Sequence, residues 1–186
     1  MVGDIGAGKS YIAKLFCYPI FNADNEVSKI YHSNRLFFKK IKKELPNFFS
    51  SFPVKKEEIK KAILTDNNNL KKIIKIIHPE IRKKLNAFLT KNRNKKIVVL
   101  DIPLFLENKL NKKNDIIIFV QSKKSEIYKR LKKRKNFNLK LFKKFKKIQL
   151  PLEYKKKKAQ FILKNNFTKL PLKKNINIIL NKIKND

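Results

Sequence analysis

The sequence predicts an α/β fold built around a parallel sheet. Residues 97–101 and 116–120 form short, continuous apolar runs, which are typical of strands buried on both faces. A glycine-rich turn after Val2 is followed by residues 9–16, which have helical spacing. Further strand-like and helix-like segments alternate along the chain, and this alternation indicates an α/β architecture.

The remaining elements follow from apolar spacing, capping residues and helix breakers. His32-Ser33 predicts a break within a helical stretch, Asp66 is a candidate N-cap, and His78-Pro79 predicts a second break. The expected strands are 18–22, 97–101, 116–120 and 161–164, and the expected helices are 9–16, 24–45, 55–64, 66–77, 80–89, 122–134, 139–148, 152–158 and 172–183. The stretch 24–89 is too long for one crossover, so we expect a helical subdomain beside the sheet.

The size and composition fit one compact domain. The chain has 186 residues, of which 42% are hydrophobic and 15 are Phe, enough for a sizeable core. No apolar run reaches the roughly 20 residues of a membrane span, and the N-terminus lacks a secretory signal pattern. Cys17 is the single cysteine; it fits a reducing cytoplasm and is expected in the core. We expect a cytoplasmic monomer with no membrane partner.

The charge balance is extreme. Lys and Arg total 48 against 14 Asp and Glu, which gives a formal net charge of +34. Such a charge is typical of nucleic-acid-binding proteins. However, Lys, Asn, Ile and Phe, which have A/T-rich codons, are abundant, whereas Gly, Ala, Arg and Trp are scarce. We attribute the charge mainly to mutational bias and expect no specific nucleic acid partner, with nucleic-acid binding as the alternative. The lysine run 155–158 is expected to be a solvated helix face.

The sequence GDIGAGKS at residues 3–10 matches the phosphate-loop pattern G-x-x-x-x-G-K-[ST]. All 3 glycines of the chain lie in this loop, where they permit a backbone whose N–H groups converge on an anion. Lys9 supplies a positive charge for the β- and γ-phosphates, and Ser10 offers a hydroxyl ligand to Mg²⁺. The motif predicts a nucleotide phosphate site, with an accidental glycine-rich turn as the alternative.

Only Met1 and Val2 precede this loop, although a phosphate loop normally follows a central strand of about five apolar residues. The first strand is therefore expected to be stunted. A start codon upstream of Met1 is one explanation, and the upstream reading frame would then encode a short stretch rich in Ile, Val and Leu. Loss of part of the sheet is the alternative.

Several further motifs, in this order and spacing, resemble the dephospho-coenzyme A kinase family over nearly the whole chain. That family carries G-G-x-G-[SA]-G-K-[ST], D-x-D, H-P, P-L-L-F-E, L-K-R and Q-x-P…K…A-[DE]-x-[VI]-x-N-N/S elements. The matching segments are GDIGAGKS at 3–10, FNAD at 21–24, IIHPEI at 76–81, VVLDIPLFLEN at 98–108, YKRLKKR at 128–134 and QLPLEYKKKKAQFILKNN at 149–166. The H-P, P-L-[LF]-x-E and Q-x-P elements are fairly specific as a set.

The resemblance implies a phosphate-loop NTPase fold of the nucleotide-kinase type. This is a three-layer sandwich with a central parallel sheet, a helical CoA-binding subdomain and a small helical lid. The core would comprise about 1–23, 95–121 and 159–186, the CoA-binding subdomain about 24–94 and the lid about 122–158. The implied reaction transfers the γ-phosphoryl of ATP to the ribose 3′-hydroxyl of dephospho-CoA, the last step of coenzyme A biosynthesis, with Mg²⁺ accompanying ATP.

The resemblance also suggests roles for individual residues. Asp24, at a strand end, would orient the 3′-hydroxyl and accept its proton, with helix capping as the alternative. Lys9 and Arg130 would stabilise charge on the transferred phosphoryl group; an ion pair with Glu126 is the alternative for Arg130. Asp101 would hold a Mg²⁺ water beside Ser10 or be a buried strand-end carboxylate. The expected ATP-binding residues are Gly3, Gly6, Ala7, Gly8, Lys9, Ser10, Tyr11, Arg130 and Arg134, and the expected substrate-binding residues are Asp24, His78, Leu104 and Glu107.

Three positions depart from the family pattern. Asp4 replaces the second loop glycine, Asn22 replaces the first Asp of D-x-D, and Phe167 follows the final Asn pair. A carboxylate beside a triphosphate is a poor neighbour unless it points away. The alternatives are therefore another small-molecule phosphate-loop kinase, such as a nucleoside monophosphate kinase, a basic nucleic-acid-binding protein, or a degraded non-catalytic descendant.

Overall fold

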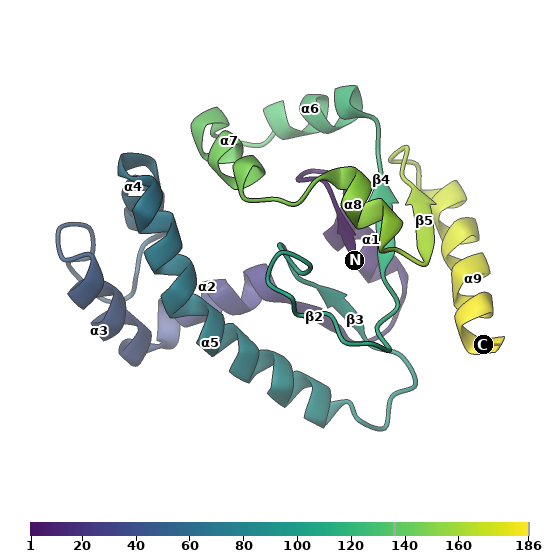
Figure 1. Cartoon of the computed structure of the whole chain (residues 1–186), viewed down its shortest axis with the longest axis horizontal. Helices are drawn as coiled ribbons and strands as arrows, with labels where there is room; N and C mark the ends of the chain where they lie inside the picture. The colour runs from purple at the N-terminus through teal and green to yellow at the C-terminus, as the bar shows by residue number, and fades with distance from the viewer. Residues whose placement is uncertain (136, 186) are drawn as a thin grey trace. The chain divides into compact units, whose positions relative to one another are not determined.

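The computed structural model describes residues 1–135 and 137–185, which divide into two compact units (Figure 1). The sheet unit comprises Met1–Phe21, Ile97–Phe137 and Lys146–Asp186. The helical unit comprises Asn22–Lys96 and Asn138–Phe145.

Parallel strands form the centre of the sheet unit. Within the described residues, β1 (Val2–Gly3), β4 (Ile118–Gln121) and β5 (Phe161–Lys164) form a three-stranded sheet in the order β1-β4-β5. Val2 lies opposite Phe119, and Ile118 lies opposite Phe161. The expected burial of the 116–120 run is confirmed for Ile117 to Val120, and β1 has only two residues, as expected.

A second strand pair joins β2 (Ile20–Asn22) to β3 (Val99–Asp101). The Val99 nitrogen donates to the Pro19 oxygen at 2.9 Å, and the Met1 nitrogen donates to the Leu100 oxygen at 3.0 Å. The second bond links the start of β1 to β3, so the carboxyl ends of β1 and β3 lie close to one another. Open α/β sheets hold their ligands at such carboxyl ends.

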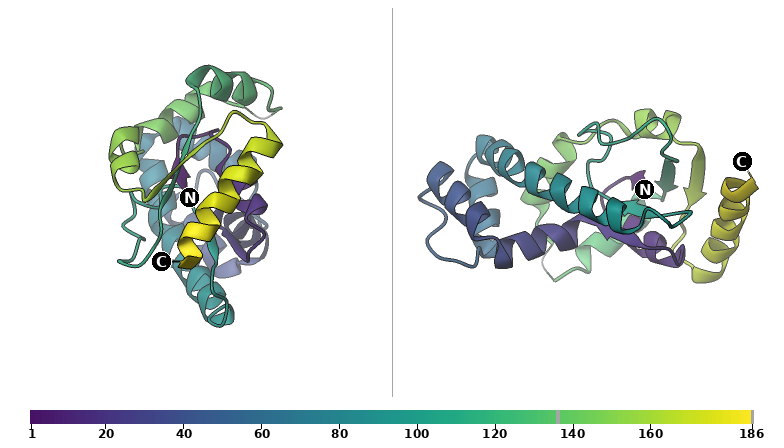
Figure 2. Two further views of the ribbon diagram at one scale, coloured as in Figure 1. Left: turned by 90° about the vertical axis from the view of Figure 1, so that its right-hand side faces the viewer. Right: turned by 90° about the horizontal axis from the view of Figure 1, so that it is seen from below.

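Helices cover both faces of the central sheet. α1 (Lys9–Leu15) contacts β3 and α9 (Lys169–Asn185), and α9 also packs on β5, as Figures 1 and 2 show. α8 (Leu152–Lys157) contacts β1 and lies in front of it in Figure 1, whereas α1 lies behind. α6 (Lys124–Lys132) follows β4 and buries Ile127 and Leu131. This is the predicted α/β arrangement of a parallel sheet between helical layers.

The helical unit packs on one long helix. α2 (Ala23–Ser33), α3 (Arg35–Glu44) and α4 (Lys56–Thr65) all contact α5 (Asn67–Lys91). α7 (Leu139–Lys147) begins in this unit. Asn34 separates α2 from α3, and its side chain accepts a hydrogen bond from the Phe37 nitrogen at 2.9 Å, which confirms the predicted break. Phe37, Ile41 and Phe49 are fully buried in the core of the unit.

Two expectations are wrong. His78-Pro79 does not break the helix: α5 runs through Pro79, because Ile73, Ile77, Ile81 and Leu85 continue one buried stripe with a spacing of four residues. The packing of this stripe outweighs the hydrogen bond that proline cannot donate. Cys17 is exposed rather than in the core, because the chain leaves α1 at this position with φ of 58° and buries Phe16 instead.

The described residues contain no helix with both the length and the apolar character needed to cross a membrane.

The partial burial of His78 should make the free energy of unfolding depend on pH. Desolvation, with a smaller contribution from the positive charge of Arg82, lowers the pKa of His78 below its ordinary 6.5. The unfolded chain therefore binds a proton at higher pH than the folded chain does. The contribution of neutral His78 to the free energy of unfolding should be complete above pH 6.5. It should be lost as the pH falls from there through the lowered pKa of the folded state.

Urea unfolding at pH 7.5 and pH 5.5 measures this effect. His78→Gln should reduce the loss of stability between the two pH values, whereas His32→Gln, at an exposed position, should leave it unchanged. An equal loss in wild type and His78→Gln would contradict the assignment.

Candidate active site

The loop between β1 and α1 requires its glycines. Gly3, Gly6 and Gly8 have φ values of 143°, 84° and 90°, a region that residues with a Cβ rarely adopt. A Cβ on Gly3 would lie 2.6 Å from the Val120 backbone oxygen, and a Cβ on Gly8 would lie 2.5 Å from Asn165 Nδ2. The loop therefore follows its path only because these positions carry no side chain.

Groups at the carboxyl ends of β4 and β5 hold this loop in place. The Ala7 oxygen accepts hydrogen bonds from Ser122 Oγ at 3.1 Å and from Asn165 Nδ2 at 2.8 Å. Asn165 is itself fixed, because its nitrogen donates to the Gln121 oxygen at 2.7 Å and its side chain is buried. No sequence pattern indicated a role for Ser122, whereas Asn165 belongs to the Asn pair that ends the family's last motif.

Lys9 lies over the loop backbone. Its Nζ donates to the Asp4 oxygen at 2.7 Å and to the Gly3 oxygen at 3.3 Å. Ser10 occupies the first turn of α1 and is exposed, and Tyr11 is 44% exposed. The loop thus presents an ammonium group and a hydroxyl group side by side at the start of α1, as a phosphate site with an accompanying cation requires.

A small pocket adjoins Lys9 and contains a buried ion pair. Lys155 Nζ lies 2.6 Å from Glu107 Oε1, with the two side chains only 3% and 9% exposed, and the same oxygen accepts from the Leu150 nitrogen at 3.0 Å. Gln149 Oε1 is buried, and the described residues give it no hydrogen-bond partner. The lining residues are Met1, Val2, Gly3, Lys9, Ile102, Pro103, Leu104, Phe105, Glu107, Gln149 and Lys155.

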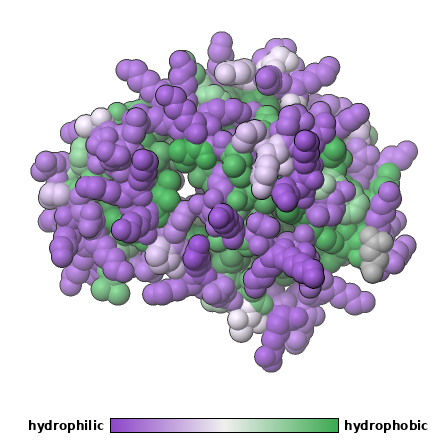
Figure 3. Space-filling model, in the orientation of Figure 1, coloured by the Kyte–Doolittle hydropathy of each residue, from purple (hydrophilic) through white to green (hydrophobic). Residues whose placement is uncertain are grey.

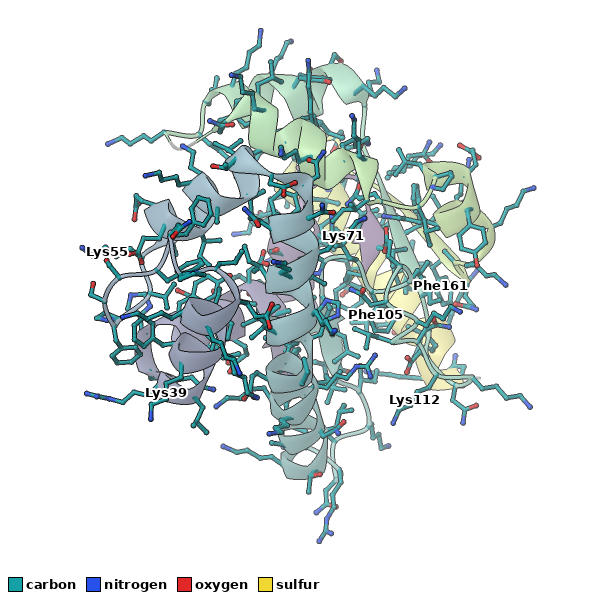
Figure 4. The ribbon with its side chains drawn as sticks, turned by 60° about the vertical axis from the view of Figure 1, so that its left-hand side comes forward. Lys39, Lys55, Lys71, Phe105, Lys112 and Phe161 are labelled. Carbon is teal, nitrogen blue, oxygen red and sulfur yellow. The ribbon has the colours of Figure 1, made fainter. Side chains whose placement is uncertain are left out.

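This pocket brings together four of the predicted site residues and one that the sequence analysis missed. Gly3, Lys9, Leu104 and Glu107 all line it, and Phe105 beside them is buried (Figure 4). Lys155 was assigned to a solvated helix face, and this is wrong. The lysine that follows Q-x-P in the family pattern was the signal that could have identified it.

Arg130 lies in the last turn of α6 and Arg134 directly after its C-cap residue Lys133, and both arginines are exposed. The Arg130 guanidinium lies 4.3 Å from the centre of the Phe167 ring, a cation–π contact. The Phe167 ring also lies next to Gly8, since a Cβ there would be 3.4 Å from it. Phe167 therefore supports Arg130 close to the phosphate loop, which the sequence did not predict.

Asp101 ends β3 and is only 3% exposed. Its carboxylate and the Ser10 hydroxyl are oxygen ligands of the kind that Mg²⁺ prefers, and α1 and β3 contact each other. No group of three His, Cys, Asp or Glu side chains that could hold a metal ion occurs among the described residues. This donor set fits Mg²⁺, which is usually held by one or two carboxylates, waters and substrate phosphates.

Asp24 and His78 belong to the helical unit, and the other predicted site residues belong to the sheet unit. The N-cap position of α2 is occupied by Asn22, whose side chain accepts from the Asn25 nitrogen at 2.8 Å. Asp24 is exposed in the first turn of α2. Burial, with a smaller contribution from the Asp24 charge, raises the pKa of Tyr31 to about 12.

Hydrophilic side chains are spread over the visible face of the molecule and do not gather in one patch (Figure 3). Lys39, Lys55 and Lys112 illustrate this distribution, because they are exposed and come from three separate segments (Figure 4).

The fold and the site define a phosphate-loop protein of the nucleotide-kinase type. A glycine loop follows a parallel strand, a lysine stands at the start of the next helix, and helices cover both faces of the sheet. A sequence profile described as dephospho-CoA kinase matches residues 1–170. The chain belongs to the dephospho-CoA kinase family. The expected family is thereby confirmed, in preference to the nucleoside monophosphate kinases.

Individual relatives agree with this assignment. A dephospho-CoA kinase from Bartonella henselae is 33% identical over 127 residues, which cover 66% of this chain and 65% of that protein. One from Wolbachia sp. subsp. Brugia malayi is 30% identical over 125 residues, or 64% of each chain. The matched stretch thus spans slightly less than two thirds of the length of these curated relatives.

Solved structures share the fold. The crystal structure of TT1252 from Thermus thermophilus superposes with a TM-score of 0.76 at 23% identity and covers 97% of this chain and 94% of that chain. Dephospho-CoA kinase from Campylobacter jejuni superposes with a TM-score of 0.64 at 23% identity and covers 98% and 94%.

The buried Glu107–Lys155 pair leads to a stability prediction. Lys155→Met should lower the free energy of unfolding by about 3–5 kcal/mol, because it leaves the Glu107 carboxylate buried without its counter-charge. The double variant Glu107→Gln/Lys155→Met should recover much of this loss. Lys157→Met removes an exposed lysine from the same helix and should change stability by less than about 0.5 kcal/mol. Urea unfolding measures all three, and equal losses in Lys155→Met and Lys157→Met would contradict the prediction.

Proposed function

We propose that this chain transfers the γ-phosphoryl group of ATP to the ribose 3′-hydroxyl of dephospho-CoA. The observation that carries the proposal is the packed glycine loop with Lys9, in a chain that belongs to the dephospho-CoA kinase family. The partners are then ATP with Mg²⁺ and dephospho-CoA. The product is coenzyme A, formed in the last step of its biosynthesis.

ATP binds at residues 3–11 in this proposal. The N–H groups of the loop surround the β- and γ-phosphates, and Lys9 leaves its backbone oxygens to contact them. Arg130, held on the Phe167 ring, stabilises the charge that spreads over the γ-phosphoryl oxygens, with Arg134 as a second cation. Ser10 and Asp101 would hold Mg²⁺, which neutralises phosphate charge when it is bound.

The acceptor requires a carboxylate beside its hydroxyl. We assign this role to Asp24, which is exposed in the first turn of α2, directly after the end of β2. Leu104 and Glu107, which line the pocket beside Lys9, would contact dephospho-CoA, as would His78 of the helical unit. We propose that residues 24–94 form the CoA-binding subdomain and that residues 122–158 form the lid. Gln149 Oε1 lines the same pocket, where a ligand hydroxyl or amine would satisfy it.

An acceptor screen tests the reaction. Purified protein with ATP and Mg²⁺ should convert dephospho-CoA to CoA, as detected by chromatography, and should phosphorylate AMP or adenosine much more slowly. Lys9→Ala should reduce kcat by about 10²–10³-fold, because the ammonium stabilises charge that develops in the transition state. Lys14→Ala changes an exposed lysine of the same helix and is the matched control. Phosphorylation of AMP as fast as that of dephospho-CoA would refute the proposal.

Asp24→Asn separates catalysis from structure. The variant should slow the chemical step by about 10²–10⁴-fold, measured in single turnovers, while binding of a non-hydrolysable ATP analogue is retained. Glu26→Gln removes another first-turn carboxylate of α2, which pairs with Lys29 at 2.6 Å, and should keep its turnover. If Asp24→Asn melts at a lower temperature with turnover intact, Asp24 is a structural residue.

A further inference from the structure

The phosphate loop contains a carboxylate of its own, Asp4. The residue is 9% exposed, so solvent screens its charge weakly. Its Oδ1 accepts a hydrogen bond from the Ile5 nitrogen at 2.7 Å, which fixes the side chain against the loop. A negative charge held at this position opposes the binding of a triphosphate.

A lysine from a distant part of the sequence pairs with this carboxylate. Lys146 Nζ lies 2.5 Å from Asp4 Oδ1, and the two side chains are 40% and 12% exposed. Lys146 lies at the end of α7 and, like Asp4, belongs to the sheet unit. The ammonium and the Ile5 N–H both donate to this one oxygen, so both counter the negative charge of Asp4 within the loop.

Asp4 thus contacts two lysines through different atoms. Its carboxylate pairs with Lys146, whereas its backbone oxygen accepts from Lys9 Nζ at 2.7 Å. Without Lys146, the nearby ammonium of Lys9 would be attracted to the Asp4 carboxylate. It would then have to leave that carboxylate in order to contact a phosphate, and ATP binding would be weaker.

We infer that Lys146 is a positioning residue of the ATP phosphate site, which neutralises Asp4 and keeps Lys9 available to the nucleotide. The inference rests on the proposed function, since it assumes that the loop binds ATP. It also explains how this chain can have Asp4 where the family has glycine, because Lys146 supplies the compensating positive charge.

A double-mutant cycle tests the inference, with calorimetric titration of the folded protein by a non-hydrolysable ATP analogue and Mg²⁺ at low salt. Lys146→Met should raise the Kd about tenfold, and the increase should shrink at high salt because the repulsion is electrostatic. Lys146→Arg should restore binding. Lys147→Met, an exposed neighbour with the same change of charge, should alter the Kd by less than about twofold.

Asp4→Gly completes the cycle. This variant should bind the analogue at least as tightly as wild type, and Lys146→Met should have less than about a twofold effect in its background. The KM for ATP should follow the same pattern, with kcat much less affected.

Three outcomes would overturn the inference. In the first, Lys146→Met leaves the Kd unchanged while it lowers the melting temperature, which makes the pair purely structural. In the second, Lys146→Met is equally harmful with Gly at position 4, which makes Lys146 a direct phosphate ligand. In the third, wild type does not bind the analogue at all, which refutes the proposed function as well. Normal analogue binding without CoA formation would refute the proposed acceptor alone.

Discussion

The site depends on one steric constraint, which is that the loop after β1 has no room for side chains at its glycines. Gly3 packs against the Val120 backbone of the neighbouring strand, and Gly8 packs against the Asn165 amide. The same amide holds the Ala7 oxygen, so close packing and hydrogen bonding fix a single path for the loop. A backbone fixed in this way needs little reorganisation when it receives an anion, which is the condition for electrostatic stabilisation of phosphoryl transfer.

Electrostatic pairing completes the site in a chain with a formal net charge of +34. Two of its carboxylates are held in the sheet unit against specific lysines, Asp4 with Lys146 and Glu107 with Lys155. The Asp4 backbone oxygen accepts a hydrogen bond from Lys9, and Glu107 and Lys155 line a small pocket together with Lys9. Lys146 and Lys155 therefore differ from the exposed lysines of the surface, because each pairs with a carboxylate that lies in the loop or in the pocket beside it.

Local patterns predicted the fold well, whereas contacts between distant residues could not be predicted. β5 was predicted from its apolar residues, and the break between α2 and α3 was predicted near His32-Ser33, next to the Asn34 that forms it; these signals lie within a few residues. The helix break at His78-Pro79 was wrong because a buried stripe of Ile and Leu on either side outweighs the proline. Lys146 resembles any other lysine in sequence, and Lys155 is marked only by its place after Q-x-P; the fold brings a carboxylate to each. The burial of Lys155 and the partner of Asp4 therefore required the structure.

The central claim is that the glycine loop is a preformed anion site. Calorimetric titration of wild type and Gly8→Ala with a non-hydrolysable ATP analogue and Mg²⁺ tests it most directly. The added Cβ would displace the Asn165 amide and strain a backbone with φ of 90°, so binding should weaken at least about tenfold. Circular dichroism and urea unfolding should show that the variant remains folded. Binding of the analogue to folded Gly8→Ala with the affinity of wild type would contradict the account.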